Sequence, residues 1–154
     1  MADFSLAIET VLANEGGLCN VSGDPGGLTN FGISQRSYPA VDIRALTPET
    51  AAAIYHRDFW HYDGITNQAL ANKIFDMSVN MGHTAISILQ RCVSVTPDGI
   101  WGPATCAATN AVDAAMPGLL DEYKMELANH YRNLVLANPA LGRFLNGWLT
   151  RASQ

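Results

Sequence analysis

The residues of this sequence best suited to chemistry begin at Glu15, which stands immediately before two glycines. Glu15 lies seven and four residues after Ile8 and Val11, so we expect its side chain on the same helical face as these apolar residues. Burial and the negative end of the preceding helix both disfavour an ionised carboxyl there. A carboxylic acid that keeps its proton near neutral pH can protonate a departing sugar oxygen. The alternative is a solvated residue at a frayed helix end, and spacing alone does not choose between the two.

A glycine-rich stretch after Glu15 supplies possible partners. Residues 23–34 alternate polar side chains with residues that allow sharp turns, which predicts a short ribbon folding back toward Glu15. Such a ribbon would set Asp24 and Thr29 opposite the acid. Asp24 would polarise a water molecule or stabilise positive charge on a sugar ring, and Thr29 would orient that water. Taken alone, however, Asp24 is more typical of a turn residue that accepts hydrogen bonds from backbone amides.

Other candidates for substrate contact lie farther along the chain. Asp76 and Asn80 are one helical turn apart and share a face that could border a cleft, although a buried scaffold role is the stronger reading of Asp76. Tyr55 belongs to an aromatic patch that could stack on sugar rings or close the core, and we expect Trp60 in the core. The histidines show no spacing that would hold zinc, so we expect neither a metal nor another cofactor.

The elements that must position these residues are mostly helices. Apolar spacing, caps and breakers predict helices over residues 4–15, 48–60, 67–81, 84–93, 103–115, 118–137 and 140–151, and a two- or three-stranded ribbon within residues 16–33. Asp3 and Thr47 are the expected N-caps of the first two helices. The predicted fold class is therefore mainly α, a helical bundle with a small glycine-rich β-ribbon after the first helix.

Composition limits the partners of the chain. With 154 residues, 48% of them hydrophobic, the chain can form a compact core, and its net charge of -5 argues against binding to nucleic acid or to an anionic membrane. No membrane-spanning segment or signal peptide is recognisable, so we expect synthesis in the cytoplasm. The three cysteines are expected to be reduced and mostly buried. We expect a monomer.

Several separated motifs carry a resemblance to a known family. They are Glu15-Gly16-Gly17, Asn20, Asp24-Pro25-Gly26-Gly27, Thr29-Asn30-Phe31-Gly32-Ile33, Tyr55, Trp60, residues 75–82, Leu89-Gln90, residues 98–105 and residues 144–151. With these motifs the chain resembles the family 108 glycoside hydrolases, lysozyme-like N-acetylmuramidases found among phage endolysins and bacterial secretion activators. The likeness continues into a C-terminal region similar to peptidoglycan-binding modules.

The resemblance implies a lysozyme-like fold with Glu15 as the catalytic acid, and a more distant kinship with phage lysozymes adds Asp24 and Thr29. Asn20 and Asn30 join Tyr55, Asp76 and Asn80 as candidate substrate-binding residues. The expected division is a catalytic region over residues 1–92 and a peptidoglycan-binding-like lobe over residues 93–154, packed as one body.

The function that follows is cleavage of the β-1,4 bond between N-acetylmuramic acid and N-acetylglucosamine in peptidoglycan glycan strands. The enzyme would reach the wall after release from the host cytoplasm through a holin-type pore. Three alternatives stay open: a lytic transglycosylase using the same Glu15, a non-catalytic protein of the cell wall or phage particle, and an export-promoting factor.

Overall fold

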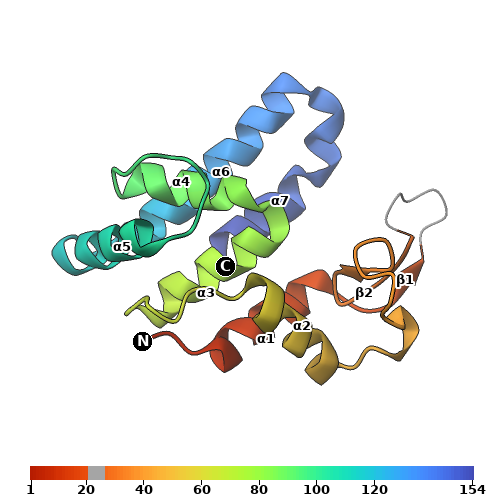
Figure 1. Ribbon diagram of the computed structural model, residues 1–154. Coiled ribbons are helices and arrows are strands. Elements are labelled where there is room, and N and C mark those ends of the chain that lie inside the picture. Colours follow the sequence, from red (N-terminus) through yellow and green to blue (C-terminus); the bar gives the residue numbers. More distant parts are fainter. Residues whose placement is uncertain (21–26) are drawn as a thin grey trace.

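The computed structural model describes residues 1–20 and 27–154, with Asn20 described by its backbone alone. The expected mainly helical fold with a small ribbon is confirmed (Figure 1). In the described residues the helices are α1 (Phe4–Glu15), α2 (Pro48–Phe59), α3 (Gln68–Met81), α4 (His83–Cys92), α5 (Pro103–Ala115), α6 (Leu119–Ala137) and α7 (Leu145–Ser153), with short 3₁₀ helices η1 (Ile43–Ala45) and η2 (Pro139–Phe144). The strands are β1 (Cys19–Asn20), β2 (Leu28–Asn30) and β3 (Ile33–Ser34).

Capping residues define where helix α1 begins and where it ends. The side chain of Asp3 accepts a hydrogen bond from the backbone amide of Ser5 at 2.8 Å, so it satisfies one of the free donors at the start of the helix. Gly16 ends the helix with a φ of 73°, a backbone conformation that glycine adopts without strain. Glu15 is therefore held at the very end of the helix, as its place before two glycines predicts.

Helix α3 runs through the core and is buried on several sides. An aromatic cluster surrounds its residue Phe75, whose ring centroid lies 5.2 Å from that of Trp60 and 5.9 Å from that of Phe4. Tyr55 and Tyr62 contact the same ring from helix α2 and from the loop that follows. Trp60 is buried, as expected for a core residue. These contacts fix helices α1 and α2 against α3 and so set the end of α1 beside α2.

The ribbon is a three-stranded antiparallel sheet in the order β1-β2-β3. Thr29, in the middle strand, pairs with Cys19 on one side and with Ser34 on the other. Phe31 and Gly32 form the two-residue turn between β2 and β3, and both have positive φ, 51° and 76°. This is the pattern of a type I′ hairpin turn, in which glycine is favoured.

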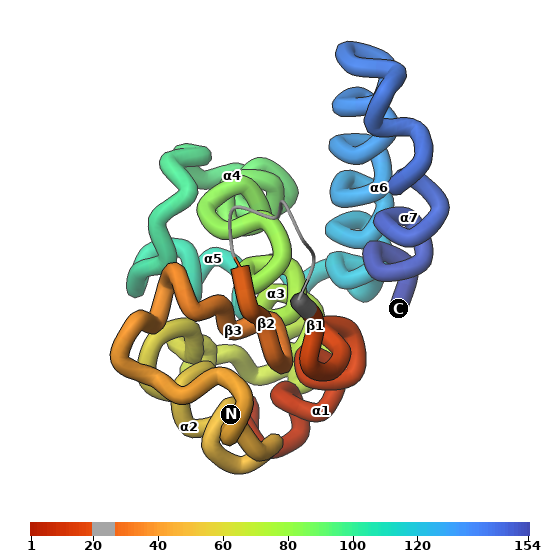
Figure 2. Tube along the Cα trace, turned by 90° about the vertical axis from the view of Figure 1, so that its right-hand side faces the viewer, coloured from red at the N-terminus to blue at the C-terminus, as the bar shows by residue number. Residues whose placement is uncertain are grey.

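Helices α6 and α7 form an antiparallel hairpin that stands beside the rest of the molecule (Figures 1 and 2). The expected helix over residues 140–151 is confirmed only from Leu145 onward, where α7 begins, because a 3₁₀ helix occupies residues 139–144. Pro139 and Gly142 are poor α-helix formers, which favours the tighter 3₁₀ turns there. The other end of α7 returns to the body, where Arg151 bonds to helix α3. No helix among the described residues is long and apolar enough to cross a membrane.

Candidate active site

Glu15 lines a pocket of about 290 Å³, called here the Glu15 pocket. The side chain of Glu15 is 19% exposed, so it is largely shielded yet reachable from solvent. The end of helix α1, the β2–β3 turn, the following loop and helices α2 and α3 all contribute to the wall. Its lining residues are Glu15, Gly32, Ile33, Ser34, Ser37, Tyr38, Tyr55, Phe59 and Val79.

Gly32 and Tyr55 lie against the carboxyl of Glu15. A Cβ atom added to Gly32 would lie 2.7 Å from Oε2 of Glu15 and 2.6 Å from the hydroxyl oxygen of Tyr55. Only glycine therefore lets the ribbon approach these two side chains so closely. The Tyr55 hydroxyl donates a hydrogen bond to the carbonyl of Phe31 at 2.8 Å, which ties helix α2 to the same turn.

Tyr55 acts in this pocket as a neutral hydroxyl. Burial raises the pKa of its phenol well above the usual value, and the nearby negative charge of Glu15 raises it further. Tyr55 was expected from the sequence as a substrate-binding residue, and it does line the Glu15 pocket.

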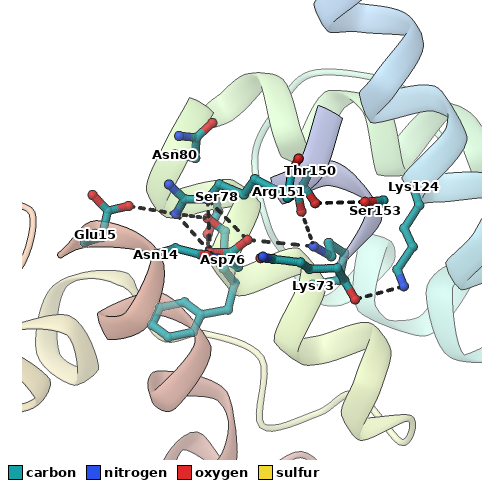
Figure 3. A network of polar contacts seen from close by, with 12 residues as sticks. Asn14, Glu15, Lys73, Asp76, Ser78, Asn80, Lys124, Thr150, Arg151 and Ser153 are labelled. Atoms are coloured by element: carbon teal, nitrogen blue, oxygen red, sulfur yellow. Dashed lines mark hydrogen bonds and ion pairs between the residues drawn. The ribbon is translucent and has the colours of Figure 1, made fainter. Parts of the chain in front are cut away.

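An arginine that the sequence analysis did not select stands beside the acid. Nη2 of Arg151, on helix α7, lies 2.7 Å from Oε1 of Glu15 and 2.9 Å from Oδ1 of Asp76 (Figure 3). Asp76 is fully buried and also accepts a hydrogen bond from the side-chain amide of Asn14 at 3.0 Å. The residue that the sequence offered as a possible cleft residue is thus the buried partner of a charged network. The only sequence signal for Arg151 was its place in the motif over residues 144–151.

The predicted residues of the ribbon have different surroundings. Thr29 pairs directly with Ser34, and directly paired residues project to the same side of a sheet, so Thr29 shares its face with a residue that lines the Glu15 pocket. Asn30 is buried, and its side-chain amide donates to the carbonyl of Ile43 at 3.1 Å. Asp24 lies outside the described residues. Asn20 pairs with Leu28 through its backbone.

Asn80, the remaining candidate, lies on helix α3 and is exposed. Its side-chain oxygen accepts a hydrogen bond from the hydroxyl of Tyr131 on helix α6. It therefore links the α6–α7 hairpin to α3 near the end of that helix. Asn80 is labelled near Glu15 and Arg151 in Figure 3.

A second pocket, of about 400 Å³, is called here the Trp101 pocket. It adjoins the Glu15 pocket, and Phe59 lines both. Tyr62 and Trp101 form part of its wall, with ring centroids 4.9 Å apart. At the boundary, the hydroxyl of Tyr38, which lines the Glu15 pocket, donates to the carboxylate of Asp58, which lines the Trp101 pocket, at 2.8 Å.

The turn over residues 98–103 carries Trp101 and is held firmly. The side-chain amide of Gln90 donates to Asp98 and Thr105 at 2.8 and 3.1 Å, and its oxygen accepts from the backbone of Gly99 at 2.8 Å. The indole N–H of Trp101 donates to the carbonyl of His61 at 2.8 Å. In the described part of the chain, no group of three or more His, Cys, Asp or Glu side chains is arranged to hold a metal ion.

A mainly helical body with a small three-stranded ribbon after its first helix is a lysozyme-like fold. Residues 8–82 match the family model of glycosyl hydrolase 108, and residues 84–153 match that of a predicted peptidoglycan domain. The chain belongs to the glycosyl hydrolase 108 family, and it is a glycoside hydrolase whose binding partner is peptidoglycan.

The structure of SagA from Brucella abortus is similar to this chain, with a TM-score of 0.75 and 27% sequence identity over 97% of this chain and 89% of that one. No match was found among curated proteins. The two family models meet at residues 82–84, whereas the division expected from the sequence fell after residue 92. Helix α4 lies between these two positions.

Proposed function

We propose that this protein is an N-acetylmuramidase that hydrolyses the β-1,4 bond between N-acetylmuramic acid and N-acetylglucosamine, with Glu15 as general acid. The observation that carries the proposal is the place of Glu15, with its Oε2 beside Gly32 and Tyr55 and its side chain lining the pocket. A shielded carboxyl open to a pocket suits protonation of the glycosidic oxygen as the bond breaks. The peptidoglycan domain in the same chain supports the choice of substrate.

Hydrolysis also requires a water molecule and a group that activates it. Among the described residues, Glu15 is the only carboxylate that lines the Glu15 pocket. We assign the second role to Asp24 and the orientation of the water to Thr29, which shares a face with Ser34 of the pocket. A separation of roughly 6.5–9.5 Å between the carboxyls of Glu15 and Asp24 would leave room for the water and invert the anomeric centre, whereas about 5 Å would give retention.

The bound glycan strand is proposed to run from the Glu15 pocket over Phe59 into the Trp101 pocket. Sugar rings present apolar faces that pack on aromatic side chains, and Phe59, Tyr62 and Trp101 line this path. Both matched regions of the chain would then contact one substrate molecule.

The test of the proposal compares wild type with Glu15→Gln in zymograms and turbidity assays on purified peptidoglycan. Loss of a general acid lowers the rate roughly 100-fold or more, so the variant should leave the wall uncleared. Glu9→Gln, an exposed glutamate on the same helix, is the matched control and should clear like wild type. Equal clearing by Glu15→Gln and Glu9→Gln would remove Glu15 from the mechanism.

The reaction products distinguish hydrolysis from transglycosylation. Both reactions are compatible with Glu15 as the single carboxylate among the described residues of the Glu15 pocket. Mass spectrometry of digested sacculi should show reducing N-acetylmuramic acid ends. Ends carrying a 1,6-anhydro ring would instead identify a lytic transglycosylase.

Within this proposal the enzyme acts as an endolysin that is made in the cytoplasm and released to the wall through a holin-type pore. Induced expression in a Gram-negative host should leave the culture intact until chloroform permeabilises the inner membrane, and lysis should then follow at once. Lysis without permeabilisation would contradict this route.

A further inference from the structure

We propose that Arg151, on helix α7, is a positioning residue of the active site that binds one oxygen of Glu15 and directs the other toward the substrate. The inference rests on the proposed role of Glu15 as the acid and adds a residue from the region that matches the peptidoglycan domain. It makes the active site a joint product of both matched regions.

The two oxygens of Glu15 have different neighbours. Oε1 accepts a hydrogen bond from Nη2 of Arg151 at 2.7 Å. Oε2 lies beside Gly32 and near the hydroxyl of Tyr55, and both of these residues line the Glu15 pocket. In a protonated carboxyl, the oxygen without hydrogen still accepts a hydrogen bond, and arginine can only donate. Arg151 therefore selects Oε1 as the acceptor and leaves the proton on Oε2, facing the glycosidic oxygen.

Arg151 can hold Glu15 in place because it is itself fixed. Its Nη2 and Nε donate to Oδ1 of Asp76 at 2.9 and 3.2 Å, and Nε also reaches Oδ2 at 3.3 Å (Figure 3). Asp76 is fully buried and the side chain of Arg151 is 13% exposed. A planar guanidinium can bind two carboxyls at fixed angles, which a lysine ammonium cannot do.

Several charged and titratable side chains lie around Glu15 and its arginine partner. The charged and titratable groups that the described residues place against it are Tyr55 from α2, Asp76 from α3 and Arg151 from α7. Lys73 lies behind Asp76, with Nζ at 3.8 Å from Oδ2. Asp76 therefore balances the positive charge of the guanidinium that contacts Glu15.

The experiment measures kcat and KM of Arg151→Gln and Arg151→Lys on solubilised peptidoglycan strands. Arg132→Gln, an exposed arginine on helix α6, is the matched control. We expect Arg151→Gln to lower kcat roughly 10- to 100-fold, since a small misplacement of the acid costs that much, with KM little changed. Arg151→Lys keeps the positive charge but loses the planar guanidinium, so it should recover only part of kcat.

Chemical rescue separates positioning from general folding effects. Guanidinium ion at low millimolar concentration should raise the kcat of Arg151→Gln severalfold, and sodium chloride at the same ionic strength should not. Because Arg151→Gln leaves the buried Asp76 without its arginine, Asp76→Asn/Arg151→Gln is tested as well. That double variant removes both charges and should show the same low kcat with a restored melting temperature.

Wild-type kcat in folded Arg151→Gln, or in the double variant where the single one fails to fold, would overturn the proposal. So would a lower melting temperature with unchanged kcat per folded molecule. Failure of the proposed function looks different, because Glu15→Gln would then keep its activity whatever the result at Arg151.

Discussion

The guanidinium of Arg151 lies 2.7 Å from the carboxyl of Glu15, although the two residues are 136 positions apart in sequence. This contact brings helix α7 to the end of helix α1, and Asp76 of helix α3 holds the same guanidinium from the other side. Three helices from two family-model regions thus meet in one charged network at the edge of the Glu15 pocket. Stability and activity should both depend on it.

The glycine of the β2–β3 turn should be essential for activity. Gly32→Ala would place a methyl group 2.7 Å from Oε2 of Glu15 in a backbone with a φ of 76°, so the carboxyl or the turn must move. We expect roughly a 100-fold loss of kcat on peptidoglycan, with strain of about 1–2 kcal/mol in denaturant titrations.

Gly118→Ala is the control for this strain. Gly118 also has a positive φ, at 119°, but an added Cβ would meet nothing within 4 Å. It should lose stability and keep its kcat. A Gly32→Ala protein with wild-type kcat would show that the ribbon need not approach Glu15 so closely.

Removal of the buried carboxylate should destabilise the protein. Asp76→Asn leaves Arg151 and Lys73 without their buried counter-charge, and breaking such a pair from one side costs about 3–5 kcal/mol. Urea unfolding measures this loss. Combined with Arg151→Gln, the same substitution should cost clearly less than the sum of the two single changes. Additive losses would argue that the two side chains are not coupled.

The Trp101 pocket should contribute to substrate binding. Ile100 is 63% exposed and lines this pocket, so Ile100→Ser should leave the melting temperature unchanged. We expect a KM for long glycan strands that is raised roughly 5- to 20-fold, a change of about 1–2 kcal/mol, with kcat unchanged. Leu136→Ser, at an 80% exposed leucine on helix α6, is the control and should keep the wild-type KM. If both variants bind strands equally well, the strand does not extend into this pocket.

Acid should weaken the link between the two pockets. Hydrogen bonds from Arg57 and then from Tyr38 hold the pKa of Asp58 at about 2 in the folded protein, below its usual value of 3.8. A lowered pKa stabilises the folded state at pH values above the unfolded pKa, and this contribution is lost as the pH falls through the folded pKa. The difference in melting temperature between wild type and Asp58→Asn should therefore be constant above about pH 5 and shrink toward pH 2. A constant difference over the whole range would contradict the shift.

Local sequence signals predicted most of the elements. Asp3 and the two glycines after Glu15 set both ends of helix α1, and the bounds expected for it and for α5 match the structure. The glycine-rich stretch after Glu15 likewise predicted the ribbon. The first part of the helix expected over residues 140–151 is a 3₁₀ helix instead, because Pro139 at its first position and Gly142 favour tighter turns that apolar spacing does not reveal. Burial was also expected for Asp76 and for Trp60, and both are buried.

The sequence by itself therefore determined that a carboxyl ends the first helix, next to backbone that only glycine can adopt. The tertiary structure alone decided what surrounds that carboxyl: the Tyr55 hydroxyl, the close approach of Gly32 and the guanidinium of Arg151. Caps and turns act within a few residues and leave a pattern in the sequence. An ion pair between distant helices leaves no such pattern, because its geometry follows from how the packed core sets one helix against another.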